Sequence, residues 1–155
     1  MPLEIRLLSP GDAAMLQHVA PGVFDHAIDP RWSAEFFADP RHHLAVAIED
    51  GLVVAMASGV HYVHPDKPPE LWVNEVGVAS THQSRGIGRQ VLAALLAHGR
   101  TLGCAEAWVI THQGNTPARR LYAAVGGAEE EGDMPVMITF DLTRSNNASV
   151  SASSG

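Results

Sequence analysis

The apolar positions of the chain fall into short runs separated by polar turns, and this pattern predicts a succession of strands and helices. Six runs are typical of strands, because they are short, rich in β-branched or aromatic residues and bounded by turn residues. These runs cover residues 3–8, 42–49, 52–63, 70–80, 104–111 and 133–143. Only Asp50 and Gly51 separate the second run from the third, and an Asp-Gly pair between two apolar runs favours a tight β-hairpin.

Four other segments carry helix signals, with apolar residues three or four positions apart and capping residues ahead of them. They are expected to be helical over about residues 13–19, 31–39, 86–102 and 117–125. Ser9 and Asp12 have the spacing of a capping box before the first of these helices. Asp29 and Thr116 each precede a proline, and proline is favoured at the first position of a helix.

The order of these elements predicts the fold class. A strand, two helices and three strands are followed by helix, strand, helix and strand, with no internal repeat and no linker that would divide the chain. We expect one α/β domain over residues 1–143, with a mixed, mostly antiparallel sheet flanked by helices. Residues 144–155 are small and polar, so a disordered tail is expected there.

Composition and charge narrow the class of protein. The chain of 155 residues has 46% apolar and 17% charged residues, which is typical of a globular domain. No apolar run approaches the roughly 20 residues that a membrane span needs, and no signal peptide is recognisable. The net charge of −7 disfavours nucleic acid as a partner and suits a cationic small molecule, although acidity also serves solubility alone. Cys104 is the single cysteine, so a cytoplasmic location is expected.

The nine histidines do not have the spacing of a metal site. His42 with His43 and His61 with His64 are the close pairs, and the sequence has neither an H-E-x-x-H motif nor a Cys/His quartet. We therefore expect no bound metal.

The stretch QSRGIGRQVLAALLAHGR, residues 83–100, places Gly86 and Gly88 directly before an apolar, helix-like run. Glycine is costly inside a helix and needs a local reason. One reason is a tight turn; the other is a bound phosphate, because the first N–H groups of a helix have no partner within it. A dinucleotide fingerprint would need a third glycine where Val91 stands, and the sequence lacks a phosphate-binding G-x-x-x-x-G-K motif.

A wider pattern connects these glycines with a later motif. A strand ending at residue 80, then Gln83-x-x-Gly86-x-Gly88 and an apolar helix, resembles the acetyl-CoA motif of the GNAT (Gcn5-related) N-acetyltransferases. The later spacing N-x-x-A-x-x-x-Y, at Asn115, Ala118 and Tyr122, is similar to a second motif of that family. The resemblance extends over residues 3–142 and implies the GNAT fold and transfer of an acetyl group from acetyl-CoA to an amine.

The resemblance also implies where acetyl-CoA binds. Its pyrophosphate would lie against the glycines, which permit close backbone approach, and its pantetheine arm would bond to the preceding strand. The residues expected to contact the coenzyme are Val76, Gly77, Val78, Gln83, Ser84, Arg85, Gly86, Ile87, Gly88, Arg89, Asn115 and Ala118.

Amine acetylation needs a proton acceptor and a proton donor. Glu75 is the candidate base, because in an extended strand it shares a face with Val73 and Gly77, and a charge there suggests a cleft. Tyr122 matches the tyrosine of the family and is the candidate acid for the departing thiolate. The alternatives are that Glu75 lies on a solvated face or in an ion pair, and that Tyr122 belongs to an apolar stripe in the core.

A narrower likeness concerns the acceptor. Residues 70–104 and 121–142 are similar to the aminoglycoside 3-N-acetyltransferases within the GNAT family, although the ending has one more residue between Val136-Met137 and Phe140-Asp141. This implies the 3-amino group of an aminoglycoside as acceptor. A polycation needs several carboxylates, and the candidates are Asp25, Asp29, Glu35, Glu70, Glu131 and Asp133, each of which is otherwise a solvated surface acid.

Two other functions share parts of the pattern. An acetyltransferase for a polyamine, another small amine or a peptide N-terminus would keep every coenzyme residue and differ only in the acceptor cleft. A non-catalytic acyl-CoA-binding module would keep Gly86 and Gly88 but would need neither Glu75 nor Tyr122. The family resemblance also makes a homodimer an expectation.

Overall fold

The hairpin expected around Asp50 and Gly51 forms the centre of the sheet in the computed structural model, which describes residues 2–143. Asp50 has φ of 52° and Gly51 has φ of 76°, so both turn residues occupy the left-handed region. A two-residue turn of this kind matches the right-handed twist of the strands that it joins. The hairpin prediction is confirmed.

Five strands form one sheet in the order β1-β2-β3-β4-β5. They are β1 (Glu4–Leu7), β2 (His42–Glu49), β3 (Leu52–Tyr62), β4 (Glu70–Val78) and β5 (Glu106–Trp108). The first three pairings are antiparallel and β4 pairs with β5 in parallel. The sheet is therefore mixed and mostly antiparallel, as expected.

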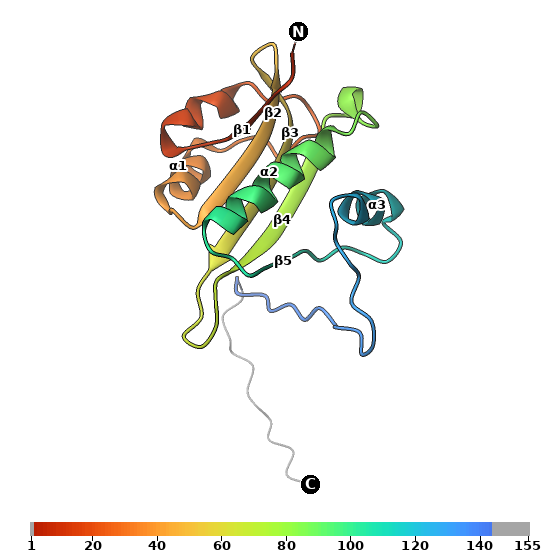
Figure 1. Cartoon of the computed structure of the whole chain (residues 1–155). Coiled ribbons are helices and arrows are strands. Elements are labelled where there is room, and N and C mark those ends of the chain that lie inside the picture. Colours follow the sequence, from red (N-terminus) through yellow and green to blue (C-terminus); the bar gives the residue numbers. More distant parts are fainter. Residues whose placement is uncertain (1, 144–155) are drawn as a thin grey trace.

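Helices lie on both faces of this sheet. They are the α-helices α1 (Pro30–Ala38), α2 (Ile87–Thr101) and α3 (Thr116–Ala124) and the 3₁₀ helices η1 (Pro10–Gln17) and η2 (Ser80–His82). α2 runs diagonally across one face, while η1 and α1 lie together beside β1 and β2, and α3 stands beyond β5 (Figure 1). The residues of α2 that face the sheet are buried, among them Val91 and Leu95.

Glycine lets α2 lie close to the sheet. A Cβ at Gly99 would lie 2.9 Å from Leu71 Cδ2, and one at Gly59 would lie 2.9 Å from the Trp72 carbonyl oxygen. Real Cβ contacts are longer than this, and the Trp72 backbone cannot move aside, so Gly59 is needed where β3 packs against β4. At Gly99 the close atom is the end of the Leu71 side chain, which shows that α2 lies directly on the sheet there.

The start of α1 follows the sequence signal, whereas the capping residue of α3 differs from the one expected. Asp29 accepts a hydrogen bond from the Arg31 N–H at 2.8 Å and caps α1, as expected. At α3 the cap is Asn115 rather than Thr116, because the Asn115 side-chain oxygen accepts a hydrogen bond from the Ala118 N–H at 3.2 Å.

The first predicted helix is a 3₁₀ helix that ends at Gln17. The next residues turn into the sheet, where the Val53 N–H donates to the His18 carbonyl and the Ala20 N–H donates to the Val53 carbonyl, each at 2.9 Å. These backbone bonds compete with helix continuation, so the helix stops before Val19. Asp12 accepts a hydrogen bond from the Ser9 N–H at 2.8 Å, as the capping box predicts.

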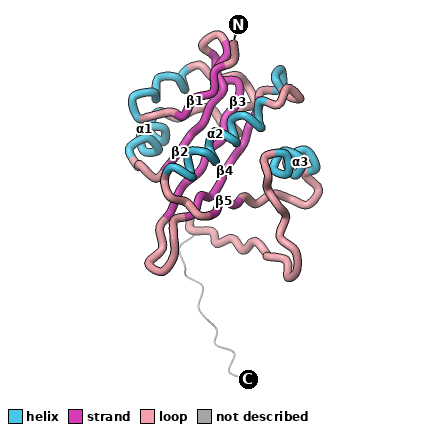
Figure 2. Tube along the Cα trace, viewed as in Figure 1, coloured by secondary structure: helices cyan, strands magenta, loops and turns pink. Residues whose placement is uncertain are grey.

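The strand expected over residues 133–143 does not form. The described chain after α3 is loop throughout (Figure 2), and Val136, Ile138 and Phe140 are 71–80% exposed. Strand propensity acts only when a neighbouring strand completes the hydrogen-bond ladder, and β5, three residues long, pairs only with β4 among the described strands.

The tail expected over residues 144–155 lies outside the described residues. None of the helices described in residues 2–143 is long and apolar enough to cross a membrane.

Three histidines form a cluster between the sheet and α2. His43 Nε2 lies 2.7 Å from His61 Nδ1, and His98 Nε2 lies 3.2 Å from His43 Nδ1, so the imidazoles form a hydrogen-bonded chain. Burial, together with the charges of the neighbouring histidines, lowers the pKa of His43 to about 4. A neutral His43 is therefore part of the folded state at neutral pH.

The lowered pKa of His43 predicts an acid-dependent loss of stability. Since the pKa of His43 is lowered on folding from 6.5 to about 4, the unfolded state binds the extra proton in this range. The free energy of unfolding should fall by about 3 kcal/mol between pH 6.5 and pH 4. Urea unfolding of wild type, His43→Gln and the exposed control His112→Gln measures it. The fall should shrink in His43→Gln alone; an equal fall in all three proteins would contradict the assignment.

Candidate active site

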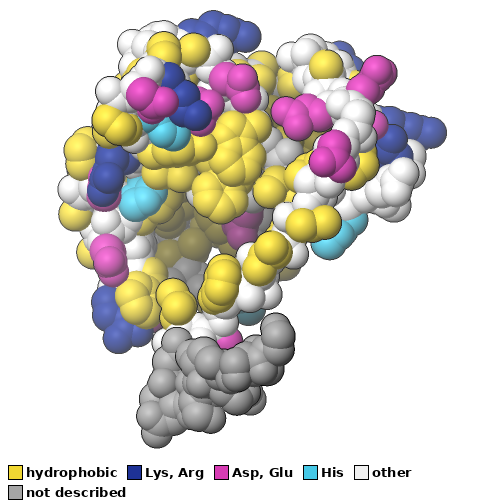
Figure 3. All heavy atoms as spheres, turned by 90° about the horizontal axis from the view of Figure 1, so that it is seen from below, with side chains coloured by type: hydrophobic (Ala, Val, Ile, Leu, Met, Phe, Trp, Pro, Cys, Tyr) yellow, Lys and Arg dark blue, Asp and Glu magenta, His cyan; other side chains and the backbone are white. Residues whose placement is uncertain are grey.

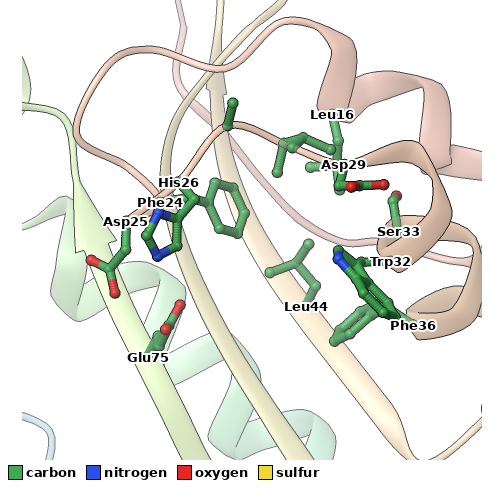
Figure 4. Close-up of a pocket in the computed structure, with 12 residues that line it drawn as sticks. Leu16, Phe24, Asp25, His26, Asp29, Trp32, Ser33, Phe36, Leu44 and Glu75 are labelled. Atoms are coloured by element: carbon green, nitrogen blue, oxygen red, sulfur yellow. The ribbon is translucent and has the colours of Figure 1, made fainter. Parts of the chain in front are cut away.

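A cavity of about 360 Å³ opens between the face of the sheet opposite α2 and the segment from η1 to α1 (Figure 4). Its walls are mostly apolar and aromatic, and three carboxylates enter it from the loop after η1, the start of α1 and β4. The lining residues include Leu16, Phe24, Ile28, Trp32, Phe36 and Leu44, with the acids Asp25, Asp29 and Glu75. Apolar walls with a few polar groups are typical of a small-molecule site.

A β-bulge in β4 turns Glu75 toward this cavity. Ser58 of β3 is opposite Glu75, whereas the next residue, Gly59, is opposite Val73, so Asn74 is the extra residue. Val73 is 3% exposed on the α2 side of the sheet, while Glu75 is exposed on the cavity side. The expectation that Val73 and Glu75 share a face is therefore wrong, because a bulge inserts one residue and reverses the alternation after it.

Close backbone contact holds the loop after η1 against β4. A Cβ at Gly77 would lie 2.0 Å from the Val23 carbonyl oxygen and 3.0 Å from the Val23 carbonyl carbon. Only glycine fits this contact, which brings Phe24 and Asp25 to the same side of the cavity as Glu75 (Figure 4). Gly77 thus positions the cavity wall.

The glycines at the start of α2 have local structural reasons. Gly86 has φ of 74° at the N-cap, and a Cβ at Gly88 would lie 3.3 Å from Val78 Cγ2. The N–H groups of the first turn nevertheless have no helical acceptor and point out of the helix end, where Arg85 and Arg89 are exposed. The two reasons for these glycines, a tight turn and a bound phosphate at the helix start, are therefore compatible with each other.

β4 has an open edge beside this helix start. Its parallel pairing with β5 covers only Glu70, Leu71 and Trp72, so no described strand pairs with residues 73–78 on that side. The Gln83 side-chain amide donates to the Val78 carbonyl at 3.4 Å. An extended molecule with amide groups could bond to this edge as an added strand does.

Tyr122 lies on α3, half-buried against the core beside Leu121 and Val125. Burial raises the pKa of its phenol, which therefore stays protonated at neutral pH. Asn115, seven residues earlier, is the N-cap of the same helix, so its side-chain oxygen already accepts a hydrogen bond from the Ala118 N–H.

The remaining acids expected at the acceptor site do not line the cavity. Glu35 is exposed on α1, and Glu131 and Asp133 are exposed on the loop after α3. Glu70 lies further along β4, where Tyr62 donates to its Oε2 at 3.0 Å and His64 Nε2 lies 3.0 Å from the same oxygen. Asp25, Asp29 and Glu75 are the acids that the structure brings together.

Sequence reasoning did not single out the aromatic walls of the cavity. Phe24, Trp32 and Phe36 line it, and Trp32 is 57% exposed. The signal was present, since Trp32 and Phe36 are four residues apart on α1 and therefore share a face. Among residues 2–143, no group of three or more histidine, cysteine, aspartate or glutamate side chains is arranged to hold a metal ion.

The sequence model of the acetyltransferase (GNAT) family matches residues 13–126, which include the cavity, the bulge, α2 and Tyr122. The chain belongs to the GNAT acetyltransferase family. The resemblance expected from the glycine motif and the later Asn115 motif is confirmed at this level.

Individual relatives and structures agree with the family. A mycothiol acetyltransferase of Thermomonospora curvata is 32% identical over 136 residues, 80% of this chain and 43% of that protein. An aminoglycoside N(6′)-acetyltransferase type 1 of Salmonella typhimurium is 30% identical over 95 residues, 57% of this chain and 66% of that protein. The chain thus spans less than half of the mycothiol relative.

A solved structure with the same fold is AAC(6′)-Iy in complex with the bisubstrate analogue CoA-S-monomethyl-acetylneamine. It has a TM-score of 0.72 and 20% identity, and the match covers 90% of this chain and 100% of that chain. At this identity the likeness shows the GNAT fold. The GNAT fold class expected from the sequence is confirmed.

The contact at Gly77 predicts a selective loss of stability. Gly77→Ala should lower the free energy of unfolding by about 3 kcal/mol, because the new methyl group overlaps the Val23 carbonyl and the backbone must move. Gly11→Ala is the matched control, since nothing lies within 4 Å of a Cβ there. Urea unfolding measures both. Equal effects of the two changes would show that residues 23 and 77 are not in close contact.

Proposed function

We propose that the chain transfers the acetyl group of acetyl-CoA to a primary amine of a cationic amino sugar of the aminoglycoside type. The observation that carries this proposal is the position of Glu75. A bulge places this carboxylate in a cavity with two further acids, on the strand whose end packs against the glycine start of α2.

The residues around α2 fit acetyl-CoA. The first turn of α2 offers N–H donors beside Arg85 and Arg89 for the pyrophosphate, and the open edge of β4 at residues 76–78 offers backbone groups for the pantetheine amides. The coenzyme supplies the acetyl thioester. The CoA part of the analogue bound to the structurally similar AAC(6′)-Iy supports this assignment.

Two side chains of this chain would move the protons. Glu75 takes a proton from the acceptor ammonium, directly or through a water molecule, so that the nitrogen becomes nucleophilic. Tyr122 keeps its phenolic proton at neutral pH because burial raises its pKa, and it donates that proton to the departing thiolate sulfur. The acetyl group passes directly to the amine, so Cys104 has no role in this reaction.

The cavity suits an amino sugar better than a peptide N-terminus. Asp25, Asp29 and Glu75 offer three negative charges to ammonium groups, and Trp32 and Phe36 offer apolar surface to a ring. Both relatives described above are named for small molecules, mycothiol and an aminoglycoside. The likeness in residues 70–104 favours the 3-amino group, while the Salmonella relative is named for the 6′ nitrogen.

We also propose a homodimer that works in the cytoplasm. The exposed apolar residues Val136, Ile138 and Phe140 and the edge strand β5 support the dimer, since a second copy would cover them. The single cysteine supports the location. Sedimentation velocity at micromolar concentration should give twice the mass of the chain; the mass of one chain would contradict the dimer.

Turnover with a panel of amines tests the proposed reaction. Free thiol released from acetyl-CoA should rise rapidly with kanamycin and gentamicin and remain near background with spermidine and a short peptide. Mass spectrometry and NMR of the product then give the acetylated nitrogen. Release with spermidine or the peptide alone would keep the GNAT reaction and refute the amino sugar. Coenzyme binding without release from any amine would instead support an acyl-CoA-binding module.

A further inference from the structure

The face of the sheet that carries Glu75 continues beyond the cavity. In the strand register, Leu44, Ser58 and Glu75 form one row across β2, β3 and β4, and His42, Val60 and Trp72 form the next row on the same face. His42 stacks on Phe36, which lines the cavity, with ring centroids 5.3 Å apart. The second row therefore adjoins the cavity wall.

An aromatic pair lies at the end of this second row. Trp72 of β4 and Trp108 of β5 are opposite each other in the parallel register, and their rings stack with centroids 5.0 Å apart and planes 11° apart. Trp72 is 39% exposed, although a tryptophan that served only the core would be buried. We refer to Trp72 and Trp108 as the aromatic platform.

A polar network holds the aromatic platform in place. The Trp108 Nε1–H donates to the Tyr62 hydroxyl at 3.0 Å, and the Tyr62 hydroxyl donates to Glu70 Oε2 at 3.0 Å. Glu70 Oε2 also lies 3.0 Å from His64 Nε2. Hydrogen bonds from Tyr62 and then His64 lower the pKa of Glu70, so this carboxylate is ionised at neutral pH. Glu106 lies opposite Glu70 in the register and adds a second negative charge.

Seen from below, the molecule has a hollow that is bordered largely by hydrophobic side chains (Figure 3). Ser58 and Val60, between the cavity and the aromatic platform, are partly exposed, so a continuous strip of surface joins the two. This strip combines apolar area with negative charge.

The spacing along this strip suits successive sugar rings. Ser58 and Val60 are two residues apart on β3, and two residues of a strand span about 7 Å. Linked six-membered sugar rings repeat at a somewhat shorter distance, and the bond from the first ring to its reacting amine adds the remainder. An amino sugar with its reacting amine at Glu75 would therefore carry its next ring to Trp72.

We propose that the aromatic platform and Glu70 form a second acceptor subsite, which stacks the neighbouring ring of a multi-ring amino sugar and pairs an ammonium group of that ring with Glu70. Tryptophan faces attract both the C–H face of a sugar and a cation, and Glu70 holds its charge beside them. The subsite rests on the proposed function, because the first ring is placed by its amine at Glu75. The subsite would favour acceptors with two or more rings over single-ring acceptors, because a single ring reaches only the cavity around Glu75.

A comparison of acceptor lengths tests the subsite. Wild type and Trp72→Leu are titrated by calorimetry with kanamycin, which has three rings, and with glucosamine, which has one, and KM and kcat are measured for both. Trp72→Leu should weaken kanamycin binding and raise its KM by about tenfold, since the lost stacking is worth about 1–2 kcal/mol. Binding and KM of glucosamine should not change. Glu70→Gln should show the same selectivity, reduced at high salt.

The result that overturns the subsite is an equal change for both acceptors, or no change for either. An equal change would mean that Trp72 only stabilises β4, and Trp72→Phe, which keeps a ring and the fold, would then behave like wild type for both. Failure of the proposed reaction has a different signature: no thiol release from any amine while kanamycin binding still depends on Trp72. Absence of kanamycin binding to wild type would also overturn the subsite.

Discussion

One extra residue in β4 decides what this fold can do. Without the bulge at Asn74, Glu75 would alternate onto the same side as Val73, which is buried beneath α2. An unpaired carboxylate there would cost several kcal/mol, and the cavity would keep only the carboxylates of Asp25 and Asp29, neither of which lies on β4. The bulge lets β4 use its first half to pack Leu71 and Val73 against α2 and its second half to present Glu75. The end of the same strand, at Val78, packs against Gly88 in the first turn of α2.

Close backbone contacts then fix the surroundings of Glu75. Gly77 admits the Val23 carbonyl, so the loop carrying Phe24 and Asp25 lies directly on β4. On the other face, Gly99 lets α2 lie directly on Leu71, and Gly59 lets β3 pack closely against the Trp72 backbone of β4. The cavity and the start of α2 are therefore positioned by the same strand, with glycines on both faces permitting the approach. Rigid support of this kind is what a site for group transfer requires, since small displacements of the reacting groups are costly.

Local signals in the sequence predicted the parts of the fold that depend on local interactions. Asp50 and Gly51 predicted the hairpin because few residues adopt positive φ, and Asp29 before Pro30 predicted the start of α1 through its cap. Gly86 and Gly88 predicted the start of α2 and the family.

The bulge at Asn74 could not be predicted, because it is defined only by the partner strand. The strand expected over 133–143 does not form for the same reason: no described strand lies beside these residues to pair with them. Trp72 and Trp108 are 36 positions apart, and only the parallel register of β4 and β5 brings them together.

The pH dependence of kcat in Glu75→Gln is the sharpest test of the proposal that Glu75 accepts the proton of the amine. At pH 7 we expect kcat to fall by about 100-fold with unchanged coenzyme affinity, and to recover toward wild type as pH rises and the amine loses its proton unaided. Glu4→Gln, an exposed change on β1, should behave like wild type throughout. Wild-type turnover in Glu75→Gln at pH 7, or a loss that stays constant up to the pKa of the amine, would contradict the account.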